Sequence, residues 1–193
     1  MRQLKVKHTA TTRIAGICGI LVPVVVFTCI GLALAQAPWF GWAENALSDL
    51  GARDNVAALF NNGMILGGIF AFIFSIGLAK ILSKKIGAYT LAISSLALIG
   101  VGLFPETIFT LHYLASAAFF IFLVISLFII GITIKQNQFE KNMGIIALIF
   151  ALFAVVSPVF LPFLNGIAIP EALVCFPALV WCMTYGAKMA VSG

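Results

Sequence analysis

The amino-acid sequence predicts an all-α membrane protein, a bundle of six transmembrane helices that forms a single domain over residues 1–193. Three observations predict it: the composition, six long apolar segments, and the separation of basic from acidic residues along the chain. Of the 193 residues, 63% are hydrophobic and 9% are charged, whereas soluble domains carry about 25% charged and roughly 45–50% apolar residues. Because so few charges cannot cover a water-facing surface, lipid must surround most of the chain.

Six segments are long and apolar enough to cross a bilayer, which takes about 20 residues. They cover residues 14–35, 56–79, 86–104, 107–134, 143–164 and 169–190. The first apolar run has about 22 residues, longer than the roughly 7–15 of a signal peptide, so we interpret it as a retained span. Short polar links make neighbouring helices antiparallel and adjacent.

Nearly all basic residues fall on one side of this six-span arrangement, and all acidic residues except Glu140 fall on the other. Of 11 basic residues, only Arg53 lies in a connection on the acidic side. The acidic residues of that side are Glu44, Asp49, Asp54, Glu106 and Glu171. By the positive-inside rule, we expect a multi-pass protein of the cell membrane with both termini in the cytoplasm. The scattered basic residues form no nucleic-acid-binding stripe, and anionic lipids at the cytoplasmic face are the expected partners.

The longest outer connection, residues 38–55, has the composition of a membrane-interface segment. Trp39, Phe40 and Trp42 suit the headgroup level. A short amphipathic interfacial helix is predicted from Trp42 to Leu50, with Gly51 as the turn residue that ends it.

Two further local features concern the second span. Asp54 or Asn55 is expected to cap its start. Gly63 and Gly67 form a small-xxx-small pair that permits close approach of another helix.

Polar side chains gather toward the outer ends of the spans, where they are candidates for function because polar groups are costly inside a bilayer. Asn61, Asn62 and His112 are expected at similar depth, with residues of the outer connections above them. His112 and Ser116 are four apart and share a helix face. The candidate catalytic residues are His112, Asp49 and Ser48, and the candidate ligand-binding residues are Asn61, Asn62, Glu106, Glu171 and Ser116.

Each candidate also has a structural interpretation. Glu106 and Glu171 follow prolines and can stabilise the starts of the fourth and sixth helices. The asparagines can form interhelical hydrogen bonds. His112 can be a structural residue, a proton shuttle, a metal ligand or a general base. The four cysteines form no CxxC pair, no phosphate-binding loop is present, and the sequence leaves the metal and the cofactor undetermined.

The segment Asn45-Ala46-Leu47-Ser48-Asp49-Leu50-Gly51, followed by Leu59-Phe60-Asn61 and Gly67, resembles a known family. So does Gly102-Leu103-Phe104-Pro105-Glu106, with His112 soon after it. Together they resemble the six-span prokaryotic membrane protein family catalogued as domain of unknown function 998. The resemblance implies a six-helix fold and makes Ser48, Asp49, Asn61, Pro105 and His112 the family-like positions. It implies no activity.

A looser similarity is to the seven-helix superfamily of alkaline ceramidases and progestin/adiponectin-type receptors, whose members hold zinc with a Ser, an Asp and several His. This chain lacks the terminal His pair and one helix.

Three functions remain open from the sequence. The first is a bundle whose outer-leaflet polar pocket binds a small molecule or lipid headgroup, as a transport-related or accessory subunit. The second is a membrane-embedded hydrolase-like enzyme that uses His112 with an Asp, a Glu or a metal. The third is a structural subunit of a membrane assembly. The sequence does not determine the oligomeric state.

Overall fold

The computed structural model describes residues 10–53, 56–134 and 137–191, except the side chains of residues 160 and 161. Within these ranges the chain is all helical and contains six helices long and apolar enough to cross a membrane, which confirms the predicted six-helix architecture and suggests a lipid bilayer environment. In lipid a backbone amide finds no water, so helices that pair their own backbone groups are the favoured spanning structure. The helices are α1 Ala10–Ala35, α2 Ala57–Ile81, α3 Ile86–Leu103, α4 Phe109–Thr133, α5 Gln138–Val156 and α6 Ala168–Val191.

The observed boundaries agree with the predicted spans to within a few residues, and α5 shows the largest shift. It begins at Gln138 rather than near residue 143 because the side chain of Asn137 accepts a hydrogen bond from the Glu140 N–H at 3.0 Å. This N-cap stabilises a polar first turn that hydropathy alone does not include. After Val156 the chain continues as a 3₁₀ helix, η3, over Ser157–Phe163.

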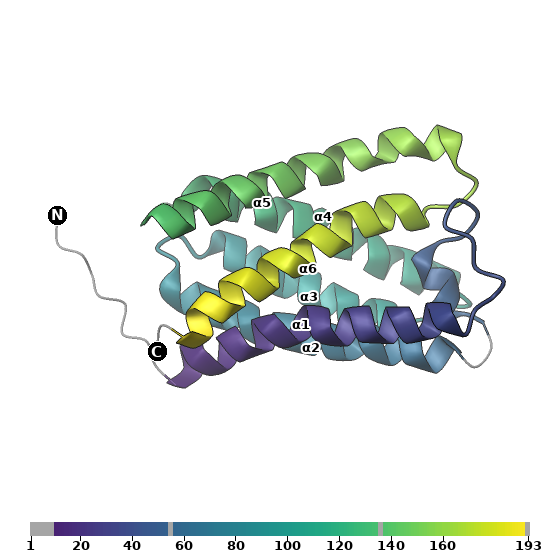
Figure 1. Cartoon of the computed structure of the whole chain (residues 1–193), viewed down its shortest axis with the longest axis horizontal. Helices are drawn as coiled ribbons and strands as arrows, with labels where there is room; N and C mark the ends of the chain where they lie inside the picture. The colour runs from purple at the N-terminus through teal and green to yellow at the C-terminus, as the bar shows by residue number, and fades with distance from the viewer. Residues whose placement is uncertain (1–9, 54–55, 135–136, 192–193) are drawn as a thin grey trace.

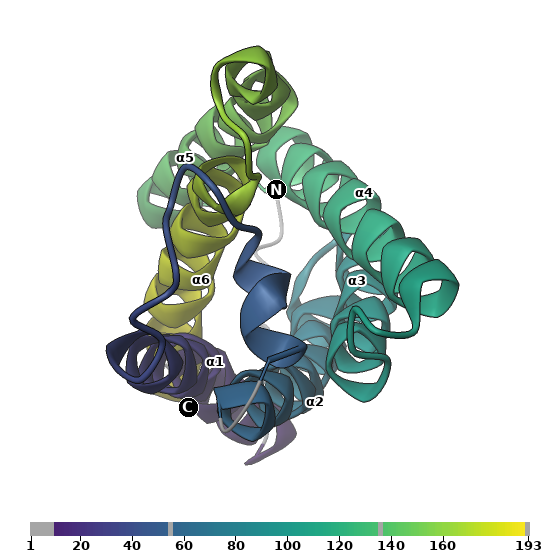
Figure 2. The ribbon, with the colours of Figure 1, turned by 90° about the vertical axis from the view of Figure 1, so that its right-hand side faces the viewer.

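The six long helices pack as a closed ring in chain order, in which each helix contacts the next and α6 contacts α1 (Figures 1 and 2). The start of α1 and the end of α6 lie together at one end of the bundle, here called the terminal end. The connection between α1 and α2 lies at the opposite end, here called the η1 end.

Glycines bring α1 close to both of its neighbours in the ring. Gly63 and Gly67 of α2 lie against Cys29 and Val26 of α1, so the close approach predicted from their spacing is confirmed. On the other side, a Cβ atom at Gly16 of α1 would lie 2.5 Å from the backbone nitrogen of Ala190 in α6. These backbone approaches hold α1 between α2 and α6 and close the ring.

The connection between α1 and α2 folds over the ring as a cover. Its helical part is a 3₁₀ helix, η1, over Leu47–Gly51, shorter than the predicted helix from Trp42 to Leu50. Figure 2 shows η1 lying across the end of the ring rather than beside it. The preceding segment is held by backbone hydrogen bonds from Gly166 to Ala43 at 2.8 Å and from Ala168 to Asn45 at 2.9 Å. The predicted cap at Asp54 or Asn55 lies outside the described residues.

Replacing Gly16 with Ala should destabilise the bundle, because the facing atoms are backbone atoms that cannot move as a side chain can. We expect a loss of about 1–3 kcal/mol, the usual size of an overpacking defect. Thermal unfolding of the detergent-solubilised protein, followed by circular dichroism, measures it.

Gly31→Ala is the matched control on the same helix. No described heavy atom lies within 4 Å of a Cβ atom built at Gly31, and Ala has a helix propensity better than Gly by about 1 kcal/mol. Equal unfolding midpoints for Gly16→Ala and Gly31→Ala would contradict the close α1–α6 packing.

Candidate functional site

The cover η1 is fixed at both of its ends by side chains of the helix ring. At its start, the Leu47 N–H donates a hydrogen bond to Glu171 Oε2 of α6 at 2.6 Å. At its end, Asn61 Nδ2 of α2 donates to the Gly51 carbonyl oxygen at 3.0 Å. Glu171 does lie in the first turn of α6, but its carboxylate binds the start of η1. Two predicted site residues therefore hold the cover in place.

Gly51 is needed here for space. A Cβ atom at this position would collide with Oδ1 of Asn61. That Oδ1 atom is buried and has no hydrogen-bond partner among the described residues. The sequence predicted Gly51 as a turn residue, and the structure adds that a larger residue would displace the Asn61 side chain from the end of η1.

Beside the cover lies a group of charged side chains from two connections. Asn45 Nδ2 donates to Asp49 Oδ2 at 2.5 Å, and the Ala46 N–H donates to the same oxygen at 3.3 Å. Asp49 also shares a hydrogen bond with the side chain of Glu106. The Arg53 guanidinium lies over the Trp39 ring, 4.6 Å from its centroid. Asp49 thus links the α1–α2 connection to the α3–α4 connection.

The capping interpretation of Glu106 is wrong. α4 begins at Phe109 and has no acidic residue in its first turn, because the Ile108 N–H closes a turn on the Pro105 carbonyl at 2.8 Å. Glu106 instead faces Asp49. Burial, followed by the hydrogen bond and the negative charge of Asp49, raises the pKa of the Glu106 carboxyl to about 7 against the opposing charge of Arg53.

His112 is buried at the start of α4 and pairs with Ser116, as their shared helix face predicts. His112 Nδ1 lies 2.8 Å from the Phe104 carbonyl oxygen, and Nε2 lies 3.3 Å from Ser116 Oγ. Because a carbonyl oxygen can only accept, Nδ1 is assigned the proton, which leaves Nε2 to accept from the serine hydroxyl. The arrangement fixes one tautomer and aims the basic nitrogen at Ser116.

Other predicted candidates are not brought together. Asn62 is exposed on the outside of α2. Ser48 is buried in η1, and the hydrogen bonds found for His112 go to Phe104 and Ser116 rather than to Ser48 or Asp49. Within the described ranges, no group of three or more His, Cys, Asp and Glu side chains is placed to hold a metal ion.

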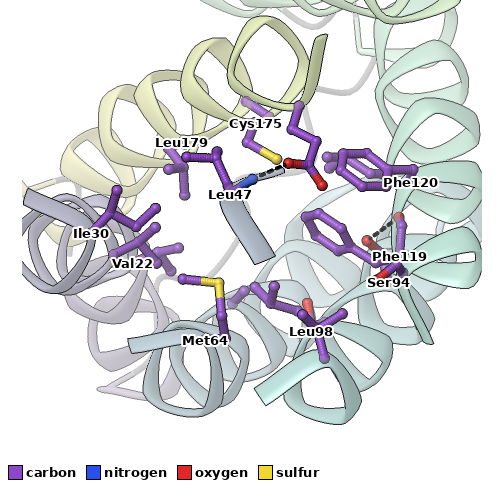
Figure 3. Close-up of a pocket in the computed structure, with 18 of the residues that line it drawn as sticks. Val22, Ile30, Leu47, Met64, Ser94, Leu98, Phe119, Phe120, Cys175 and Leu179 are labelled. Atoms are coloured by element: carbon purple, nitrogen blue, oxygen red, sulfur yellow. Dashed lines mark hydrogen bonds between the residues drawn. The ribbon is translucent and has the colours of Figure 1, made fainter. Parts of the chain in front are cut away.

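A cavity of about 90 Å³ lies inside the ring below η1, and its polar groups are few (Figure 3). Side chains of α1, α2, α3, α4, α6 and η1 line it, whereas α5 contributes no described residue. In the same measure a single water needs about 10–15 Å³. Most of the wall is apolar, unlike the polar pocket expected from the sequence. The polar or thiol-bearing lining residues are Ser48, Ser94, Ser95, Ser116, Glu171, Cys175 and Cys182.

Except for Ser116, the sequence did not identify the lining residues of α3 and α4. Ser94 and Ser95 are small polar residues in an apolar run, which is a weak signal, and their hydroxyls bond to the backbone carbonyls of Phe119 and Leu91. In the sequence, nothing distinguishes Phe119 and Phe120 from ordinary lipid-facing residues. The packing of the ring places both at the cavity.

The stability of the protein should depend on pH through Glu106. A carboxyl whose pKa is raised in the folded state stabilises the fold below its ordinary pKa, and that contribution is lost as the pH rises through about 7. The wild-type unfolding midpoint should therefore fall between pH of about 5 and about 8. Glu106→Gln mimics the neutral form and should flatten this slope.

The exposed Glu44 of the α1–α2 connection provides the control, and Glu44→Gln should keep the wild-type slope. An unchanged slope in Glu106→Gln would contradict the assignment to Glu106.

Comparison with known proteins identifies the family. No match was found to a curated protein or to a solved structure. The sequence model of the family described as "Protein of unknown function (DUF998)" matches residues 20–188, a range that contains η1, the cavity lining and all the predicted site residues. The chain therefore belongs to the DUF998 family, as the motifs around Ser48 and His112 predicted.

Proposed function

We propose that this membrane protein binds a small amphipathic molecule, such as a lipid, in the cavity below η1. The observation that carries the proposal is the arrangement of the lining. Apolar side chains cover most of the wall. Ser48 comes from η1, Glu171 from the first turn of α6 and Ser116 from about two turns into α4, all toward the η1 end. Such a site fits a ligand with an apolar body and one polar head.

Ser48 is the strongest indication that a polar ligand group belongs here. Its side chain is 8% exposed, lines the cavity, and its hydroxyl has no hydrogen-bond partner among the described residues. A ligand head can hydrogen-bond to the Ser48 hydroxyl, while the apolar chain of the ligand fills the apolar part of the cavity.

The proposal includes an orientation: the η1 end faces outward and the terminal end faces the cytoplasm of a cell membrane. It is supported by the charges, because Lys80, Lys84 and Lys188 lie in last turns or links at the terminal end. The cavity would then be reached from the outer leaflet, which suits a transport-related or accessory role.

Cysteines placed at two exposed positions test this orientation. Glu44→Cys should react with a membrane-impermeant maleimide added to intact cells, and Lys84→Cys should react only after lysis, because the two positions lie at opposite ends of the bundle. Labelling of both from the same side would contradict the topology.

Filling the cavity should abolish ligand binding. Ala71 of α2 lines the cavity and is buried, so Ala71→Leu places extra atoms in the space that the ligand needs. The probes are single-chain amphiphiles with one common alkyl chain and an alcohol, amine, carboxylate or phosphate head. In lipid nanodiscs, at least one should bind saturably to the wild type and raise its unfolding midpoint.

Ala58→Leu makes the same substitution at an exposed position of the same helix and should bind like the wild type. A bundle that serves only as a structural subunit would bind none of the probes saturably, which would refute the proposal.

A second candidate is a hydrolase, and the specific observation in its favour is the pairing of Ser116 with His112. The base lies within hydrogen-bond reach of the hydroxyl, and the Phe104 carbonyl orients the base, as in an activated nucleophile. Ser116 lines the cavity, so a bound ester would meet the hydroxyl. The serine differs from the Ser48 that the sequence suggested.

An ester-hydrolysis assay tests this second candidate function. Ser116→Ala and His112→Gln should each reduce turnover of a long-chain ester by about 100-fold or more while alcohol or amine binding in the cavity persists. Turnover that survives in both variants would exclude this pair as the catalytic groups.

A further inference from the structure

We propose that the ligand enters the cavity sideways from the bilayer, through an opening between α4 and α6, and that its head is a primary amine or a hydroxyl. This inference rests on the proposed binding function and adds the route and the chemical class.

The opening is visible in the exposure of the cavity lining. Every described lining residue on α1, α2, α3 and η1 is buried. The lining residues that are partly exposed all come from the two helices on either side of α5: Ser116, Phe119 and Phe120 on α4, and Glu171 and Cys175 on α6. Figure 3 shows Phe119 and Phe120 facing Cys175 and Leu179 across the cavity. The cavity is therefore open on this side of the ring.

The position of α5 explains the opening. α5 packs tightly on α4 near the terminal end, where a Cβ atom on Gly131 would lie 2.9 Å from the Gly144 carbonyl oxygen. Toward the η1 end the two helices diverge, and α5 stays beside α6 (Figure 2). Because α5 gives the cavity no described lining residue, the side between α4 and α6 is left uncovered at the level of Ser116.

Entry from the η1 end is blocked by the cover. Its two hydrogen bonds, Leu47 to Glu171 and Asn61 to Gly51, attach it to α6 and to α2, the two helices on either side of α1. Leu47 and Leu50 are buried beneath it at 5% and 0% exposure. A ligand arriving from water would have to break both bonds, whereas the lateral opening requires no bond to break.

The surface around the opening is suited to lipid. The outward side chains of α4 and α5 are large and apolar, with Leu114 59% exposed, Ile121 56%, Phe153 56% and Val156 45%. Exposed apolar helix faces of this kind contact acyl chains in a membrane. A membrane amphiphile can therefore slide its chain between α4 and α6 without passing through water.

The charges at the polar end select the head group. Glu171, Glu106 and Asp49 are close enough to interact electrostatically, and the nearby cation, Arg53, lies over the ring of Trp39. A carboxylate or phosphate head would add another negative charge to this end, and like charges repel strongly in a low-dielectric site. A head that donates hydrogen bonds, an amine or a hydroxyl, can bond to Ser48 and to the carboxylate of Glu171.

Photolabelling in lipid nanodiscs tests both parts. The probes are a long-chain primary amine with a diazirine in its alkyl chain and the carboxylic acid of the same chain. Peptide mapping should find saturable labelling of cavity residues by the amine, and at least about tenfold less by the acid. Equal labelling by the acid would overturn the head-group assignment.

Larger side chains at the opening between α4 and α6 test the lateral route of entry. Cys175→Trp narrows the opening from α6 and Phe120→Trp narrows it from α4, so each should slow cavity labelling by about tenfold or more. Val180→Trp adds the same side chain on the exposed side of α6, where the residue is 51% exposed, and should label at the wild-type rate. Unfolding midpoints near that of the wild type show which variants are folded.

The outcomes distinguish lateral entry from the proposed ligand-binding function on which it rests. Saturable cavity labelling at the wild-type rate in both narrowed variants would overturn lateral entry and leave ligand binding standing. No saturable cavity labelling by either probe or by the corresponding alcohol would overturn both.

Discussion

The attachment of η1 to the helix ring is the constraint on which the candidate site depends. Six helices packed as a ring leave an interior space at the η1 end that their side chains do not fill. At the η1 end this interior is closed by a five-residue 3₁₀ helix, whose first amide and last carbonyl need partners in apolar surroundings. Glu171 and Asn61 supply those partners from two separate helices. The cavity exists because these bonds hold η1 across the end of the ring rather than inside it.

The same contacts explain why polar residues concentrate at one end of an otherwise apolar bundle. Asp49 fixes the segment before η1 through Asn45 and meets Glu106 from the next connection. Gly51 leaves room for Asn61, and Gly166 allows the loop before α6 to pair with Ala43. Residues that a membrane would normally disfavour are retained here because they satisfy one another and the exposed backbone of the cover.

The terminal end of the bundle is built differently. Lys188 of α6 forms an ion pair with Glu140 of α5 at 3.1 Å, and Trp181 Nε1 donates to the Met143 carbonyl oxygen at 3.0 Å. These contacts hold α5 firmly on α6 at one end, while α4 and α5 separate toward the other. A rigid terminal end and an open side near η1 therefore follow from where the polar and aromatic contacts are placed.

The sequence by itself determined the six helices, because hydropathy and helix length respond to the bilayer rather than to tertiary contacts. It also predicted that His112 and Ser116 share a helix face and that Gly63 and Gly67 permit close approach of another helix, since both follow from helix periodicity. It offered a helix-start role for Glu106, predicted a helix several residues longer than η1, and grouped Ser48 with His112. The structure corrects these three points because each depends on how a loop folds over other helices. Only the tertiary structure decided that Phe119, Cys175 and Ser48 line one cavity. These residues come from three elements far apart in the chain, and no sequence period relates the inner face of one helix to that of another across a ring.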